Sequence, residues 1–265
     1  MVAAGLSLVN SNIEADGIIH RGRAESDKAG SSNAWYVLHL GDPPYGAFGN
    51  WRTGQSETWT PASFRAATPA ERQALAVRMA EIKAARDAEQ AAIRAASRVR
   101  AAKLWNRGRP ACNDHPYLIK KRVGAYGVRD LRGQLVIPMR DAGGTLHSLQ
   151  FIGADGRKAF LTGGRKRGCY FAIGRPGAEI CICEGYATAA SVFEATGHAT
   201  ACAFDAGNLE PVARSLRGKF PDIRITICAD DDAETKNNPG LSYAEAAARA
   251  VHGYLAVPVF VERAQ

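Results

Sequence analysis

The sequence lacks several features that would assign it to a common class. No apolar run approaches the roughly 18 residues of a membrane-spanning helix. The first residues, MVAAGLSLVN, have neither the basic start nor the long apolar core of a signal peptide. No Walker A motif is present, which argues against a P-loop ATPase. We therefore expect a cytoplasmic protein that does not engage a membrane.

The cysteines have no zinc-binding spacing. Six are present and none forms a CxxC pair, so a zinc ribbon is not expected. Cys181 and Cys183 lie two residues apart in an apolar stretch, and in a strand such residues face the same side. This arrangement suits small buried side chains better than a zinc site. We expect free thiols.

The charge is divided unevenly along the chain. Hydrophobic residues make up 46% and charged residues 23% of the 265 residues, which excludes wholesale disorder. The overall net charge is +8. Residues 65–175 contain 23 Lys and Arg against 8 Asp and Glu, whereas the remainder contains 11 against 18. A basic middle beside an acidic end indicates a polyanion held next to a cation site.

Residues 1–64 read as a small β-rich unit with turns rich in glycine and proline. Its aromatic residues include Trp35, Tyr36, Trp51 and Trp59. Such side chains stack on unpaired bases in single-strand binding proteins, and they also form the cores of small domains. The core is the favoured interpretation.

Residues 65–105 read as one long helix. Thr68 and Pro69, followed by Glu71, form a helix start signal, and neither glycine nor proline follows until after Trp105. Charged residues such as Arg86 interrupt the apolar stripe, which argues against a long dimeric coiled coil. We interpret this segment as a linker or strut.

Residues 106–175 form a basic segment that we expect to be α+β. The stretch QLVIPMRDAGGTLHSLQFI predicts two strands joined by a turn at 141–144. A cluster of Arg165, Lys166 and Arg167 then lies between glycines. Glycine lets the backbone approach a phosphate closely and the charges neutralise it, but a solvated basic loop has the same composition.

Residues 176–265 alternate between strand and helix patterns in the order β-α-β-α-β-α-β. The third helix pattern covers 240–254 and the last strand pattern, AVPVFVE, covers 256–262. This order predicts an α/β fold with a Rossmann-like, mostly parallel sheet covered by helices.

Acidic residues follow two of these strands. Glu184 ends the first strand and Asp230, Asp231 and Asp232 end the third. Carboxyl ends of parallel strands share one edge, and acids gathered there repel one another unless a cation offsets them. Asp230 and Asp232 point the same way on an extended chain, so they are the favoured ligands, with Asp231 second. Their oxygens suit Mg²⁺ or Mn²⁺, and Gly185 would permit the tight turn into the next helix.

These motifs resemble a known family. CICEGYATAAS, followed by ICADDDAETKNNPG, resembles the Toprim fold, in which one strand ends Glu-Gly and a later strand ends Asp-x-Asp. The intervening DAGNL, with Gly207 and Asn208, resembles the turn after its second strand. HPYLIKKRVGAYGVR and LVIPMRDAGGTLHSLQFIGADGRKAFLTGG resemble the segment before Toprim in bacterial-type primases, especially those encoded by phages and plasmids.

The resemblance implies an enzyme with named site residues. It implies a DNA primase that makes short primers on a single-stranded DNA template from NTPs, with metals held by Glu184, Asp230 and Asp232. The residues expected to contact nucleotide or template are Arg140, Lys158, Arg165, Lys166, Arg167, Lys120, Lys121 and Arg122. A helicase or replication initiator would be a separate polypeptide.

Two other functions use the same motifs. A Toprim nuclease would direct water at a phosphodiester with the same acids, and a non-catalytic nucleic-acid-binding module would retain the fold alone. The primase-like segment before residue 176 favours synthesis, and the presence of all three family acids favours catalysis.

Overall fold

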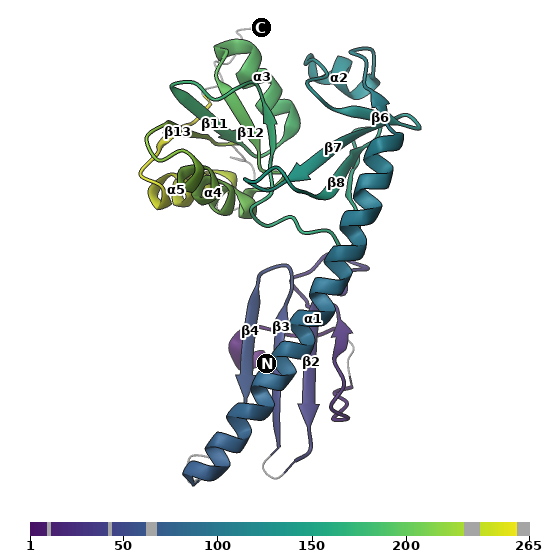
Figure 1. The fold of residues 1–265 in the computed structure, drawn as a ribbon, viewed down its shortest axis with the longest axis vertical. Coiled ribbons are helices and arrows are strands. Elements are labelled where there is room, and N and C mark those ends of the chain that lie inside the picture. The colour runs from purple at the N-terminus through teal and green to yellow at the C-terminus, as the bar shows by residue number, and fades with distance from the viewer. Residues whose placement is uncertain (10–11, 42–43, 62–67, 231–238, 259–265) are drawn as a thin grey trace, which may run out of the picture. The chain divides into compact units, whose positions relative to one another are not determined.

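The computed structural model describes residues 1–9, 12–41, 44–61, 68–230 and 239–258. The chain divides into two compact units, Met1–Ala91 and Ala92–Gln265, and the boundary lies within the long helix α1 (Pro69–Arg107). Figure 1 labels the helices and strands of both units. In the described part of the chain, no helix combines the length and the apolar character needed to cross a membrane.

Unit 1 contains a four-stranded antiparallel sheet in the order β1-β2-β3-β4. The strands are β1 (His20–Gly22), β2 (Ala34–His39), β3 (Tyr45–Asn50) and β4 (Gln55–Trp59), and the short helix η1 (Val2–Ala4) precedes them. Trp35 packs on one face with Ile82 of α1, and Tyr36 packs on the other with Leu6. Both aromatic rings are therefore core, whereas Trp59 is 42% exposed.

The close pairing of β3 with its neighbours requires glycine at Gly46 and Gly49. A Cβ on Gly49 would lie 2.1 Å from the Gln55 carbonyl oxygen and 2.8 Å from the Trp35 ring. The absence of a side chain there makes room for the buried indole. The Arg86 guanidinium lies 4.9 Å from the ring centre of Trp35, on the α1 side of the sheet.

Helix α1 begins at the predicted start signal, which forms a capping box. Thr68 Oγ1 accepts a hydrogen bond from the Glu71 backbone N–H, and Glu71 Oε2 accepts one from the Thr68 backbone N–H. Its first part contributes Ile82 to the core of unit 1. Its last turns contribute the fully buried Ala101 and the partly buried Trp105 to a cluster in unit 2. The helix predicted as a linker thus belongs to the packing of both units.

The first sheet of unit 2 is antiparallel, in the order β5-β6-β7-β8-β9. Its elements are β5 (Arg109–Pro110), α2 (Pro116–Lys121), β6 (Arg129–Leu131), β7 (Gln134–Arg140), β8 (Leu146–Ile152) and β9 (Lys158–Phe160). The side chains of β7 alternate, so that Val136 packs with α1 while Leu135 and Ile137 face the main core. Gly144, with φ 86°, ends the predicted turn between β7 and β8.

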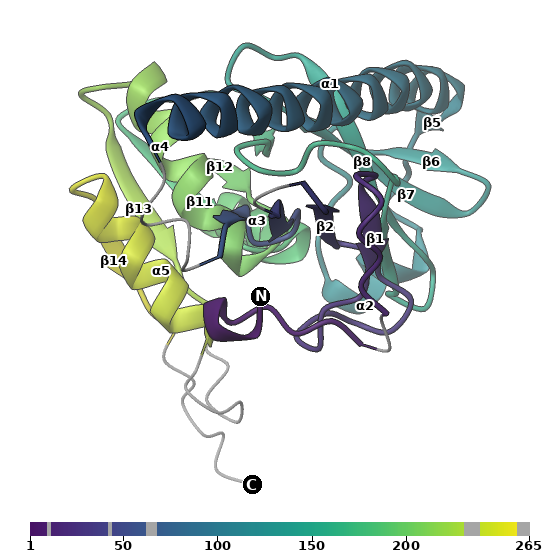
Figure 2. The ribbon, with the colours of Figure 1, turned by 90° about the horizontal axis from the view of Figure 1, so that it is seen from below.

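The second sheet has the order β10-β12-β11-β13-β14, and only β10 is antiparallel to its neighbour. The elements are β10 (Phe171–Ile173), β11 (Glu179–Cys183), α3 (Tyr186–Thr196), β12 (Ala199–Cys202), η3 (Ala206–Asn208), α4 (Leu209–Lys219), β13 (Arg224–Cys228), α5 (Pro239–Ala250) and β14 (Tyr254–Ala256). Helix α3 packs on one face, and α4 and α5 pack on the other (Figure 2). The predicted mostly parallel α/β sheet is confirmed.

The end of α5 differs from the sequence prediction. The helix was expected to run to Tyr254, but it ends at Ala250, and Tyr254 begins β14. The Gly253 backbone N–H donates to the Ala248 carbonyl oxygen at 2.9 Å and His252 has φ 49°, which closes the helix with a turn. The strand predicted over 256–262 is also misplaced, because β14 ends at Ala256 and neither Val257 nor Pro258 is in a strand. Residues 259–262 of that prediction lie outside the described residues.

The two sheets of unit 2 share one hydrophobic core. Leu135 and Ile137 from β7 belong to the same buried cluster as Cys183 and Tyr186. The Tyr186 hydroxyl also donates to the Gly124 carbonyl oxygen at 2.7 Å. The predicted border at residue 176 is therefore not a gap in packing, and this shared core fixes the basic segment against the acidic edge.

Candidate active site

Acidic residues lie at the carboxyl edge of the parallel strands. Strand β11 leads directly into Glu184, and β13 is followed by Ala229 and Asp230. Because Cys183 is in register with Cys228, the two carboxylates leave neighbouring strands at the same edge. Both are half-buried. Asp231 and Asp232, the other predicted ligands, lie outside the described residues.

The start of α3 contacts the end of β13. The Thr188 hydroxyl donates a hydrogen bond of 3.4 Å to Asp230 Oδ1. Thr188 lies in the first turn of α3, which begins just after Glu184 and Gly185. The positive end of the α3 dipole therefore lies next to both acids.

The turn at Gly185 does not require glycine for its backbone. Gly185 has φ −106° and ψ 160°, which any residue adopts, so the predicted role of glycine in permitting the turn is not needed. A Cβ there would lie 3.6 Å from the Lys158 Nζ atom, an ordinary contact. This distance places the Lys158 ammonium group directly over the turn between β11 and α3.

Lys158 comes from the other sheet of unit 2. It begins β9, the last strand of the antiparallel sheet, and its ammonium group reaches the turn beside Glu184. Burial raises the pKa of the Cys202 thiol to about 12, and the charges of Lys158, Glu184 and Asp230 all act on that thiol. The Cys202 Sγ atom also donates to the Glu184 carbonyl oxygen at 3.4 Å. One lysine and two acids from three segments therefore surround the same point.

A third acid, which the sequence prediction missed, follows β12. Asp205 comes two residues after Ala203, whose backbone N–H donates to the Cys183 carbonyl oxygen. The Asp205 carboxylate forms an ion pair with Lys166. The Lys166 Nζ atom also lies 5.1 Å from the centre of the Phe160 ring. Asp205 lies in the motif DAGNL, in which the sequence prediction rests on the small residues Gly207 and Asn208.

Asn208 joins the basic turn to the end of β12. Its Oδ1 atom accepts a hydrogen bond from the Gly168 backbone N–H at 2.8 Å. Its Nδ2 atom donates to the carbonyl oxygens of Ala203 at 2.8 Å and Cys169 at 3.0 Å. Asn208 is only 2% exposed, so these bonds form away from water. The neighbouring Gly207 lies in η3. A Cβ atom added to Gly207 would lie 3.5 Å from Asp205 Oδ1.

The other predicted basic residues have different surroundings. The Arg140 guanidinium donates to the Gly144 carbonyl oxygen at 2.9 Å, within the β7–β8 turn. The Arg165 Nε atom donates to the Arg167 carbonyl oxygen at 3.1 Å, which shapes the basic turn. The remaining three, Lys120, Lys121 and Arg122, are exposed at the end of α2.

The cysteines are free thiols, as predicted. Cys183 and Cys202 are fully buried directly behind the acidic edge, and Cys181 is 4% exposed. Burial raises the pKa of the Cys202 thiol, so its sulfur stays protonated near neutral pH. The donors that face the edge are therefore oxygens rather than thiolates.

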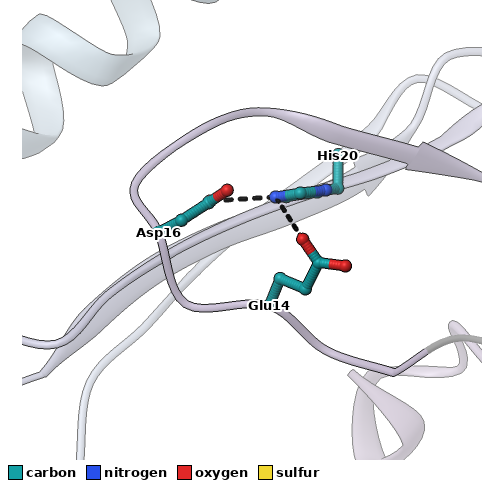
Figure 3. A group of neighbouring side chains, drawn as sticks. All are labelled: Glu14, Asp16 and His20. Atoms are coloured by element: carbon teal, nitrogen blue, oxygen red, sulfur yellow. Dashed lines mark hydrogen bonds and ion pairs between the residues drawn. The ribbon is translucent and has the colours of Figure 1, made fainter.

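Unit 1 contains a separate cluster of two acids and a histidine. His20 Nε2 lies 2.9 Å from Asp16 Oδ1 and 3.9 Å from Glu14 Oε2 (Figure 3). The Asp16 carboxylate also accepts a hydrogen bond from the Ile18 backbone N–H, and together these bonds lower the pKa of Asp16. The His20 ring stacks on Tyr36, with 5.1 Å between ring centres. These contacts form a local ion-pair network at the start of β1.

Comparison with known proteins agrees with the geometry of unit 2. The sequence model of a family described as the Toprim domain matches residues 179–264. This segment is therefore similar to a Toprim domain. The matched residues include the strands β11 to β14, and Glu184, Asp205 and Asp230 all lie at the carboxyl edge of these strands.

The sequence around the matched segment also has relatives. Two proteins from Escherichia coli, each named DNA primase TraC, are 39% identical to this chain. The two alignments are 257 and 277 positions long, and they cover 92% and 98% of this chain. The chain covers only 24% and 19% of the length of these relatives. A solved structure, the primase fragment of the bacteriophage T7 primase-helicase protein, is 16% identical over 58% of this chain and 66% of that chain, with a TM-score of 0.42.

Proposed function

We propose that this chain is a DNA primase, a nucleotidyltransferase that synthesises short primers on single-stranded DNA from NTPs. The observation that carries the proposal is the meeting of half-buried Glu184 and Asp230 with Lys158 from the basic segment. The Toprim match and the 39% identity to proteins named DNA primase support it.

The acidic edge fits a hard divalent cation. Its facing donors are carboxylate oxygens, which Mg²⁺ and Mn²⁺ prefer, whereas the nearby thiols are buried and protonated. We assign the ligands to Glu184 and Asp230, together with Asp231 and Asp232. Cations bound there would offset the charge on the nucleotide phosphates and activate the attacking 3′-hydroxyl group.

The basic residues of the chain bind and orient the substrates. Lys158 faces the acidic edge, where its ammonium group would bind a nucleotide phosphate. Lys166 and its neighbours Arg165 and Arg167 would bind further phosphates of the nucleotide or template. The exposed residues at the end of α2 and Arg140 would bind the template electrostatically, with an affinity that falls as salt rises.

The predicted four-part organisation follows this division of roles. Residues 176–265 would hold the metals, 106–175 the nucleotide and template, and 1–64 and 65–105 would form the aromatic unit and its connecting helix. We expect the reaction to occur in the cytoplasm. A separate helicase or replication initiator would open the duplex and expose the single-stranded template.

Primer synthesis provides the direct test. The purified chain is incubated with Mg²⁺ or Mn²⁺, labelled NTPs and single-stranded DNA, and the products are separated on a gel. We expect short new oligonucleotides. Shortened template would instead indicate the Toprim nuclease, and binding without either product would indicate the non-catalytic module.

Two conservative variants connect this activity to the acids. We expect Glu184→Gln and Asp230→Asn each to lower the primer-synthesis rate by about 100-fold or more while single-stranded DNA binding stays near wild type. Glu210→Gln is the matched control, because Glu210 pairs with Arg214 on the exposed surface of α4. Undiminished synthesis by either acid variant contradicts the assignment.

A further inference from the structure

The ion pair between Asp205 and Lys166 is built on two fixed segments. Its side chains are partly exposed, 33% for Asp205 and 40% for Lys166, but the paired oxygen, Asp205 Oδ2, is itself buried. An exposed lysine has a flexible stem of four carbons and samples many rotamers. Here a carboxylate confines the ammonium group to one place.

The carboxylate is fixed by the end of β12. Phe204, which precedes it, has φ 74°, a conformation that non-glycine residues rarely adopt. The Phe204 backbone N–H donates a short hydrogen bond of 2.7 Å to the Glu184 carbonyl oxygen. Such a backbone persists only where its surroundings enforce it, and here the enforcing contact comes from the acidic residue itself. Asp205 is thereby held beside Glu184.

The lysine is fixed by Asn208. The Asn208 amide binds the turn at Gly168 and Cys169 and the end of β12 at Ala203 simultaneously. Because both ends of this clamp are backbone atoms, the Lys166 main chain cannot move away from Asp205 without breaking buried hydrogen bonds. The Asp205–Lys166 ion pair and the Asn208 hydrogen bonds therefore connect the end of β12 to the basic turn at two points.

A chain of contacts through Phe160 and Phe204 connects the Lys166 ammonium group to the Glu184 backbone. The ammonium group lies over the Phe160 ring, and Phe160 contacts Phe204 edge to face, with 6.4 Å between ring centres. Phe160 is two residues after Lys158 in β9, so both side chains project from the same face of that strand. The Lys166 ammonium group thus lies over Phe160 of β9, and the Lys158 ammonium group from the same strand lies beside Gly185, next to Glu184.

We propose that Asp205 is a positioning residue that holds the Lys166 ammonium group where the phosphates of the incoming nucleotide bind. The inference rests on the proposed primase function and assigns Asp205 no part in metal binding. Among the residues that the structure describes, no three acids at this edge bring their ligand atoms within 4.8 Å of one another. The Asp205 carboxylate is instead neutralised by lysine.

A double-mutant cycle tests this role. Asp205→Asn keeps the shape of the side chain and removes its charge, and Lys166→Met keeps the length of the stem and removes the ammonium group. We expect Lys166→Met to raise the KM for NTP by about tenfold or more. Asp205→Asn should raise KM by about threefold to fivefold, the range of a partly exposed ion pair, with kcat within about twofold of wild type.

The double variant decides the mechanism. If Asp205 acts through Lys166, the double variant should have the KM of Lys166→Met alone. An undiminished effect of Asp205→Asn in the Lys166→Met background would overturn the proposal, as would an unchanged KM in Asp205→Asn. Weaker Mn²⁺ binding by Asp205→Asn, measured without nucleotide, would assign it to the metal instead and also overturn the proposal.

The double-mutant cycle can also be measured through nucleotide binding, without primer synthesis. The dissociation constant of a fluorescent NTP analogue with Mg²⁺ reports the same coupling in the full chain, and Glu210→Gln should leave it unchanged. If the wild-type chain binds NTP but makes no primers, the proposed function fails while the cycle still judges Asp205. If it makes primers and the two substitutions are additive, the function stands and the positioning role is refuted.

Discussion

Replacing Asn208 with alanine should destabilise unit 2 through the loss of one buried amide. The substitution removes three hydrogen bonds of 3.0 Å or shorter, to Gly168, Ala203 and Cys169. Each such bond contributes about 1 kcal/mol net, and buried groups left without partners add to the loss. We expect the free energy of unfolding to fall by about 3 kcal/mol. The melting temperature should fall by about 6–12 °C.

The assay is urea and thermal unfolding of the full chain, followed by circular dichroism, with Asn113→Ala as the control. The Asn113 Oδ1 atom accepts one hydrogen bond of 2.8 Å from the Ala125 backbone N–H in an exposed loop. Its loss should lower the free energy of unfolding by about 0.5–1 kcal/mol. Equal losses in the two variants would refute the reasoning, because burial would then have no influence.

A second substitution at Asn208 tests the direction of its bonds. Asn208→Asp keeps the acceptor for Gly168 but turns an oxygen toward the carbonyl oxygens of Ala203 and Cys169. Three acceptors then face one another in a site that excludes water. We expect Asn208→Asp to be at least as unstable as Asn208→Ala at neutral pH. A near-native stability of the aspartate variant would contradict the assigned amide orientation.

Two further predictions concern the supports of the site. Tyr186→Phe removes the hydroxyl group that donates to the Gly124 carbonyl oxygen and accepts from the Tyr126 backbone N–H. We expect the free energy of unfolding, measured by urea titration, to fall by about 1–2 kcal/mol. An unchanged urea midpoint would refute this contribution of the hydroxyl group. Partial burial raises the pKa of Asp141, but the hydrogen bonds with His147 and the Thr145 backbone N–H, together with the charges of His147 and Arg165, outweigh it and lower the pKa below its usual 3.8. This contribution to stability is present above pH 3.8 and is lost as the pH falls through the lower folded value, so the stability difference between wild type and Asp141→Asn should shrink in acid. A difference that grows below pH 3.8 would show the opposite sign of linkage.

The sequence predicted the acidic edge because its signal is local. A run of β-branched and apolar residues ending in an acid defines both the strand and the place where the acid leaves the sheet, as for Glu184 and Asp230. The parallel order of the strands then brings the acids together without knowledge of any side-chain contact. The same reasoning correctly assigned Trp35 and Tyr36 to a core.

The contacts made by Lys166 were beyond such reasoning. Asp205 meets Lys166 across 39 positions of sequence, through a turn whose shape depends on the Asn208 amide. Composition showed that the 165–167 turn is basic, but a basic turn in solvent looks the same. The end of α5 was misplaced for a related reason, because alanine-rich helix propensity continued past Ala250 while a turn at Gly253 ended the helix.

The core that joins the two sheets of unit 2 has a practical consequence for dissecting the protein. A fragment that began at residue 176 would retain β11 to β14 but would leave Cys183 and Tyr186 facing water in place of Leu135 and Ile137. Exposed apolar surface of this kind promotes aggregation. A fragment intended for crystallisation or NMR is therefore better started within α1, near Ala92, where the packing of unit 2 begins.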